Sequence, residues 1–154
     1  MKCAIDDTIA YIKRMAQNMA GFDPDYAVLA FMLDLKIPVN LYGFEYLKLA
    51  ILMRYKNPTM DLTNEIYWKI AEVHGDIGGD VISSSIRRVI RSSFSPDNIT
   101  KWKLYLPASS LTMGYPPTNA ETIAGLARIL EFWQGCSEAY LRQASKEVVS
   151  CGRK

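Results

Sequence analysis

Hydrophobic residues recur every three or four positions along nearly the whole chain, which predicts α-helices. The clearest case follows Gly79, where Ile82, Ile86, Val89 and Ile90 stand at i, i+4, i+7 and i+8 and form one apolar stripe. The opposite side of this predicted helix, residues 80–94, is polar and basic, with Ser83, Ser84, Arg87, Arg88 and Arg91. A helix with a core-facing stripe and an arginine-rich side suits contact with a polyanion.

A shorter helix is predicted before it, over residues 63–73, with Ile66, Ile70 and Val73 at i, i+4 and i+7. The glycines between the two patterns give the backbone the freedom for a sharp turn. Two helices meeting across such a turn make a helix-turn-helix candidate. Solvated helix faces are commonly charged, however, so the pattern also occurs in proteins that bind no nucleic acid.

The remaining segments also predict helices. Apolar stripes indicate helices over residues 5–20, 24–35 and 41–55, and a short helix that contains Trp102 follows Ser95-Pro96-Asp97. Thr118 and Glu121 have the spacing of a capping box that opens a further helix, which Gly135 kinks or ends before a last amphipathic helix over 137–149. No convincing β-alternation is present. The fold class is therefore predicted to be all-α, with seven or eight helices.

Length and composition indicate one ordinary globular domain, because the chain has 154 residues, 49% hydrophobic and 22% charged. The net charge of +2 does not by itself demand nucleic acid. Residues 80–103, by contrast, carry five bases against two acids, a local charge of +3 to which Lys101 and Lys103 contribute. A local basic patch of this kind is what phosphate binding needs.

Catalytic and metal chemistry find little support. Cys3, Cys136 and Cys151 lack metal-ligand spacing and are interpreted as reduced thiols, and His74 is the single histidine. Its place at the end of a predicted helix favours a role as a cation near a helix C-terminus. Apolar runs fall far short of the roughly 20 residues that a membrane span requires. We expect a cytoplasmic protein that is not an enzyme and has no metal, cofactor or small-molecule substrate.

Two further expectations concern packing and capping. Trp68, Trp102 and Trp133 are expected in the core or in an interface, because aromatic side chains bury large areas. Asp80 is expected to cap the helix that follows Gly78-Gly79, in preference to an anion bound there.

Three sequence blocks carry a family resemblance: Ile37-Pro38, Gly43-Phe44-Glu45-Tyr46-Leu47 and Pro117-Thr118-Asn119-Ala120-Glu121. In this order they resemble blocks of the C-terminal effector domain of the stage-zero sporulation master response regulator. The likeness covers residues 22–133. It implies a six-helix DNA-binding domain with a helix-turn-helix whose fourth helix enters the major groove of double-stranded DNA. Residues 1–21 and 134–154 would then be an extra helix at each end, the second with a basic tail.

The resemblance also implies roles for individual residues. Arg87 matches an arginine of the family's recognition helix, and Arg88 stands where the family has a histidine. Ser83 and Ser84 replace a glutamate and an arginine, so a different target sequence is expected. The expected DNA contacts are Ser83, Ser84, Arg87, Arg88, Arg91, Lys101 and Lys103.

Assembly and control are expected to differ from those of the family. Its members bind tandem sites with the last helix near a partner subunit, so a homodimer or a related regulator is a possible partner. The family's phosphoacceptor receiver domain has no counterpart before the match. The alternative function is an interaction module that kept the fold, lost base readout, and binds or antagonises a related regulator through its terminal helices.

Overall fold

The longest helix, α7 (Asn119–Cys151), is the element against which most of the chain packs. The computed structural model describes residues 4–75, 78–107 and 114–151. Within these ranges the chain forms seven α-helices and no strand, which confirms the predicted all-α class. The others are α1 (Ala4–Asn18), α2 (Pro24–Asp34), α3 (Tyr42–Lys56), α4 (Tyr67–Val73), α5 (Gly79–Ser93) and α6 (Ile99–Tyr105), and a π-helical turn η1 (Leu62–Ile66) leads into α4.

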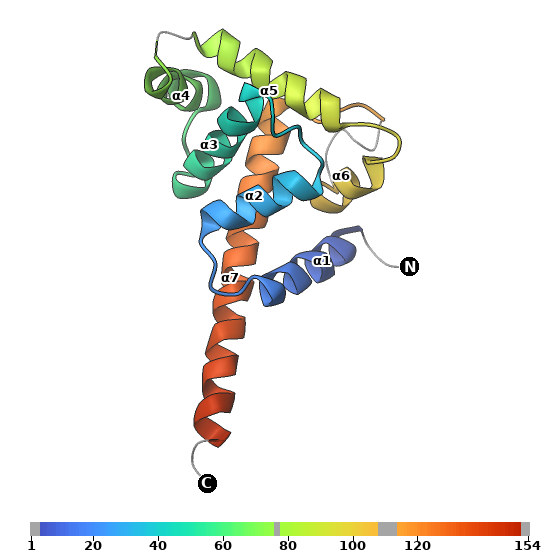
Figure 1. Ribbon diagram of the computed structural model, residues 1–154, viewed down its shortest axis with the longest axis vertical. Helices are drawn as coiled ribbons and strands as arrows, with labels where there is room; N and C mark the ends of the chain where they lie inside the picture. The colour runs from blue at the N-terminus through green and yellow to red at the C-terminus, as the bar shows by residue number, and fades with distance from the viewer. Residues whose placement is uncertain (1–3, 76–77, 108–113, 152–154) are drawn as a thin grey trace.

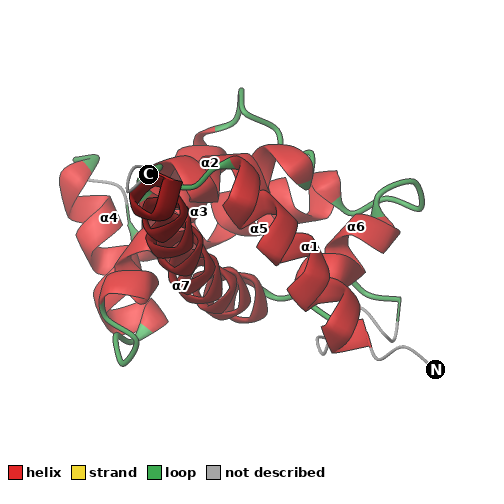
Figure 2. Ribbon diagram, turned by 90° about the horizontal axis from the view of Figure 1, so that it is seen from below, coloured by secondary structure: helices red, strands yellow, loops and turns green. Residues whose placement is uncertain are grey.

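The helices form a body around the first half of α7. Helices α1, α2 and α3 pack on α7, α5 packs on α3 and α4, and α6 packs on α1 and α7. Figure 1 shows α4 and α5 at one end of this body, while the second half of α7 extends beyond it at the other end. Seen from below in Figure 2, α4 lies to the left of α7, and α1 and α6 lie to its right. No helix of the described residues is long and apolar enough to cross a membrane.

Helix α7 is continuous where two helices were predicted. Gly135 does not end it, so the predicted helix over 137–149 is the distal half of α7. Trp133 and Ser137 on either side of the glycine are buried, and the Ser137 hydroxyl accepts a hydrogen bond of 3.1 Å from the Gly21 amide. This packing offsets the roughly 1 kcal/mol that a glycine costs inside a helix.

The start of α7 is capped as predicted. The Thr118 amide donates to the Glu121 carboxylate at 3.2 Å, and the Glu121 amide donates to the Thr118 hydroxyl at 3.1 Å. These reciprocal bonds confirm the capping box and satisfy amide donors at the helix N-terminus. The predicted cap of α5 was wrong, because Gly78 is its N-cap residue and Asp80 lies within the first turn.

Two apolar side chains near α4 lie outside the core. Trp102 and Trp133 are fully buried, but the Trp68 side chain is 68% exposed and Val73 is 73% exposed. Helix α4 has only seven residues, and its buried side is formed by Tyr67, Ile70 and Ala71. His74 is the C-cap residue of α4, as predicted, with its ring edge-on to Tyr46 at a centroid distance of 5.1 Å.

Candidate nucleic-acid interface

Helix α5 is fixed to the body by the predicted apolar stripe. Ile82, Ile86 and Val89 are fully buried, and Ile90 is 1% exposed, which confirms the stripe. Burying such side chains contributes roughly 1.5–3 kcal/mol each. The helix therefore has one orientation relative to the body. The same packing determines which residues of α5 face away from the body.

That opposite side carries free positive charge. Ser84, Arg87, Arg88 and Arg91 are exposed. Within the described ranges, none of the three guanidinium groups takes part in an ion pair or a hydrogen bond. Figure 1 places α1 and the distal half of α7 on the far side of the body from α5, so neither end helix covers this face. The arginine face of α5, which we define as Ser84, Arg87, Arg88 and Arg91, is open to an anionic partner.

Ser83 lies differently from the prediction. It is half-buried, and its carbonyl oxygen accepts a hydrogen bond of 2.9 Å from the Asn119 carboxamide nitrogen. The Ser83 hydroxyl lies 3.4 Å from the same nitrogen. Ser83 thus faces the start of α7 and does not belong to the arginine face.

A groove runs between α5 and the start of α7. Arg87 and Arg91 line one wall, and Tyr115, Pro116 and Thr118 line the other. Leu62 and Thr63 of η1 also line it. The groove brings two arginines of α5 beside exposed polar and aromatic groups that the sequence pattern did not associate with them.

The C-terminal end of α5 is tied to two other elements. The Asn98 carboxamide nitrogen donates to the carbonyl oxygens of Ser93 at 2.9 Å and Leu35 at 2.5 Å. The Trp102 indole N–H lies 3.4 Å from the same Ser93 oxygen. Both ends of the helix are therefore held by buried side-chain amides, from Asn119 at one end and Asn98 at the other.

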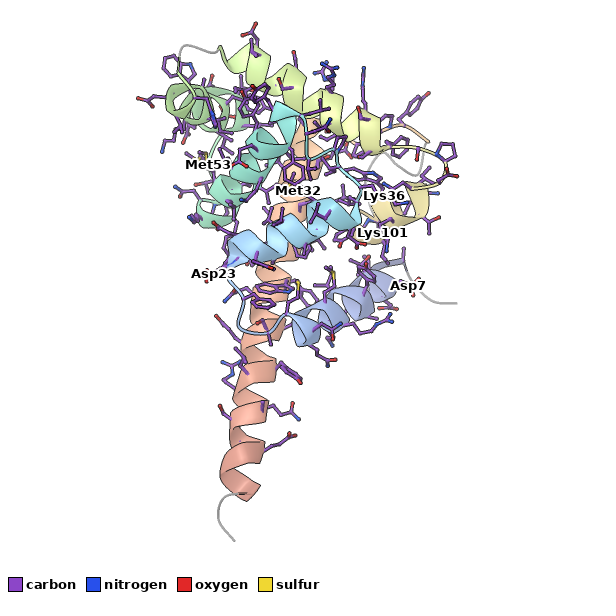
Figure 3. All side chains as sticks on the ribbon, in the orientation of Figure 1. Asp7, Asp23, Met32, Lys36, Met53 and Lys101 are labelled. Atoms are coloured by element: carbon purple, nitrogen blue, oxygen red, sulfur yellow. The ribbon has the colours of Figure 1, made fainter. Side chains whose placement is uncertain are left out.

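Lys101, one of the predicted DNA contacts, is held in a partly exposed ion pair within the protein. Its ammonium lies 3.3 Å from the Asp34 carboxylate, 3.1 Å from the Tyr11 hydroxyl and 4.9 Å from the centre of the Tyr11 ring. The bond to Tyr11, and then the charge of Asp34, raise the pKa of Lys101 above its ordinary value. Figure 3 shows Lys101 between α2 and α1. Lys103, on the same helix, is exposed.

Asp34 also accepts hydrogen bonds from the hydroxyls of Tyr105, at 2.7 Å, and of Tyr11. Burial, followed by the bond to Asp34, raises the pKa of Tyr105 far above the usual tyrosine value. The same two causes raise the pKa of Tyr11. These groups join α1, α2 and α6, and the cluster is structural because it lies in the packing between these helices.

Metal binding finds no site among the described residues. No group of three or more His, Cys, Asp or Glu side chains within them could hold an ion. Cys136 is a free thiol whose pKa is raised by burial. A raised pKa keeps a thiol protonated, and a protonated thiol is a poor nucleophile.

Asn119 is the residue of this region that reasoning from sequence missed. It stands inside the Pro-Thr-Asn-Ala-Glu block, where Thr118 and Glu121 already explain the start of a helix. Its position next to the cap residue was the available signal, but its partners are 36 and 52 residues away in sequence. Local spacing gives no access to such contacts.

Comparison with known proteins identifies the family. The family model described as sporulation initiation factor Spo0A C terminal matches residues 28–130, which is more than half of the chain. No curated protein matches the chain. The match includes all of α3, α4, α5 and α6 and leaves out α1 and the distal half of α7. The chain therefore belongs to the Spo0A C-terminal family of sporulation regulators, a family of helical DNA-binding domains.

Proposed function

We propose that this protein reads double-stranded DNA by laying α5 in the major groove, with α4 and α5 as a helix-turn-helix. The observation that carries this proposal is the open arginine face opposite a fully buried stripe. The major groove of B-DNA is wide enough to admit an α-helix. An arginine on such a helix can donate two hydrogen bonds to a guanine or can contact a phosphate.

Fewer residues are proposed to contact DNA than the sequence suggested. Arg87, Arg88 and Arg91 meet base edges or phosphates, Ser84 adds a short hydrogen-bonding group, and Lys103 reaches a phosphate. Ser83 is left out because it faces Asn119, and Lys101 because Asp34 holds its ammonium. The protein would regulate transcription by occupying its DNA site. Binding of two copies side by side on repeated DNA sites stays a prediction.

The test is DNA binding measured across a salt series, with duplexes selected by the wild-type chain from genomic fragments. We expect affinity to fall steeply with salt, because bound cations are released from phosphates that the protein neutralises. Arg87→Ala should weaken binding by roughly 1–3 kcal/mol if a base contact is lost.

A matched control removes the same charge elsewhere. Arg142 is exposed and belongs to the distal half of α7, and Figure 1 shows this half of the helix at the opposite end of the molecule from α5. Arg142→Ala should leave affinity within experimental error of wild type. Equal losses for Arg87→Ala and Arg142→Ala would show that only overall charge matters. Absent or salt-insensitive DNA binding together with a tight protein partner would favour the interaction-module function.

A further inference from the structure

We infer that Asn119 is a positioning residue for DNA reading, and this inference rests on the proposed function. The carboxamide of Asn119 joins the two helices of the proposed helix-turn-helix to α7. Its nitrogen donates to the Tyr67 hydroxyl of α4 at 3.1 Å and to the Ser83 carbonyl oxygen of α5 at 2.9 Å. One side chain thus connects α4, α5 and α7.

The placement of this contact along α5 gives it influence over the arginines. Ser83 lies one helical turn before Arg87 and two turns before Arg91. Holding the Ser83 carbonyl fixes the height and rotation of α5 at its beginning, where the apolar stripe has only Ile82. A recognition helix contacts bases mainly through its N-terminal residues, so a small rotation there displaces the readers.

Burial makes the contact strong enough to matter. Asn119 is 9% exposed, and the Tyr67 residue that accepts from it is 4% exposed. A hydrogen bond shielded from water competes less with solvent, and its loss leaves buried acceptors unpaired. The bond therefore selects one arrangement of α5 on α7.

The sequence context sets Asn119 apart from the cap beside it. Thr118 and Glu121 form reciprocal hydrogen bonds with one another at the start of α7, whereas Asn119 donates to α4 and α5. Thr118→Ala removes the cap alone, and Asn119→Ala removes the connection to α4 and α5. These two variants separate loss of helix stability from loss of position.

The experiment measures two properties of wild type, Asn119→Ala and Thr118→Ala. The first is the ratio of affinities for a selected duplex and for a scrambled duplex of the same composition. The second is amide hydrogen exchange in the first two turns of α5. If Asn119→Ala does not fold, Asn119→Leu replaces it, because leucine has similar volume and no donor.

For Asn119→Ala we expect exchange in the first turns of α5 to rise roughly fivefold, from the loss of one net hydrogen bond. We expect the affinity ratio to fall about tenfold, since a displaced bidentate arginine loses discrimination of that order. The slope of affinity against salt should stay the same, because the number of phosphate contacts does not change. Thr118→Ala should leave hydrogen exchange in the first turns of α5 unchanged, because the Asn119 carboxamide still donates to the Ser83 carbonyl oxygen.

Tyr67→Phe serves as an intermediate variant. It removes the hydroxyl that accepts from Asn119 and keeps the hydrogen bond from Asn119 to the Ser83 carbonyl oxygen. It should give a smaller loss of discrimination than Asn119→Ala. An unchanged affinity ratio in Asn119→Ala overturns the inference, whether or not exchange rises. Wild-type chain that fails to bind any duplex overturns the proposed function itself, and this outcome is seen before any variant is made.

Discussion

Gly43 of α3 and Ser85 of α5 mark a close helix crossing: a Cβ built on Gly43 would lie 2.2 Å from the Ser85 carbonyl oxygen. The same Cβ would lie 2.8 Å from a methyl carbon of Val89. Any larger side chain at Gly43 must move α5, because backbone atoms cannot shift as a flexible side chain can. The position of the arginine face therefore depends on a residue with no side chain, on a different helix.

Gly43→Ala should destabilise the fold. We expect the free energy of unfolding to fall by roughly 1–3 kcal/mol, because the added methyl group overpacks a backbone contact. Urea denaturation with a far-ultraviolet signal measures this. An unchanged unfolding midpoint would show that α3 and α5 are farther apart than described, and DNA affinity should then also be unchanged.

The same substitution at Gly135 should have the opposite sign. Gly135 lies inside α7, it is exposed, and a Cβ there would meet nothing within 4 Å. Gly135→Ala should raise the free energy of unfolding by about 0.5–1 kcal/mol, because alanine loses less backbone entropy in a helix. A loss of stability would indicate that α7 bends or ends at this position in solution.

Lys101 and Lys103 of α6 should behave differently in DNA binding. Lys103→Ala should reduce the slope of log affinity against log salt by about 1, as expected for one lost phosphate contact. Lys101→Ala should leave that slope unchanged and should cost at most about 1 kcal/mol of stability, because its ion pair with Asp34 is partly exposed. Fluorescence anisotropy at several salt concentrations distinguishes the two.

Equal slopes for these two variants would contradict the assignment. If both lower the slope, the Lys101 ammonium leaves Asp34 when DNA binds. If neither does, the footprint of the protein on DNA does not extend to α6.

Stability should decline at alkaline pH through Tyr105. Its pKa is raised in the folded state above the ordinary value of 10.0, so the stabilisation is complete below that value and is lost as pH rises above it. We expect the free energy of unfolding to fall from about pH 10 upward by up to about 1.4 kcal/mol per pH unit for this group. Tyr105→Phe should flatten that fall in urea titrations at successive pH values, and an unchanged fall would assign it to other groups.

Periodicity predicted the parts of the fold that depend on burial of one helix face. The stripe of α5 and the capping box of Thr118 and Glu121 could be predicted because each is decided within a few residues of sequence. The exposure of Trp68 and Val73 did not follow from the pattern. Trp68 lies two positions from the buried Ile70 and so on the opposite face of α4, and Val73 is the last residue of this short helix. Helix α7 does not end at Gly135, because the packing of Trp133 and Ser137 on either side outweighs the low helix propensity of glycine.

The candidate site was predictable only as far as its exposed residues. The exposure of three arginines could be predicted because they lie opposite the buried stripe of the same helix: Arg87, Arg88 and Arg91. Ser83 and Lys101 have the same appearance in the sequence as their neighbours. Their partners, Asn119 and Asp34, come from distant segments, and no local pattern distinguishes a lysine in an ion pair from a solvated one.

The continuity of α7 has a consequence for distance. A helix of 33 residues is roughly 50 Å long, and this one starts in contact with α5. It is a stiff arm that keeps whatever is attached to its far turns several nanometres from the arginine face. A fluorophore placed at Gln143 can therefore report the tumbling of the whole molecule while leaving the duplex untouched.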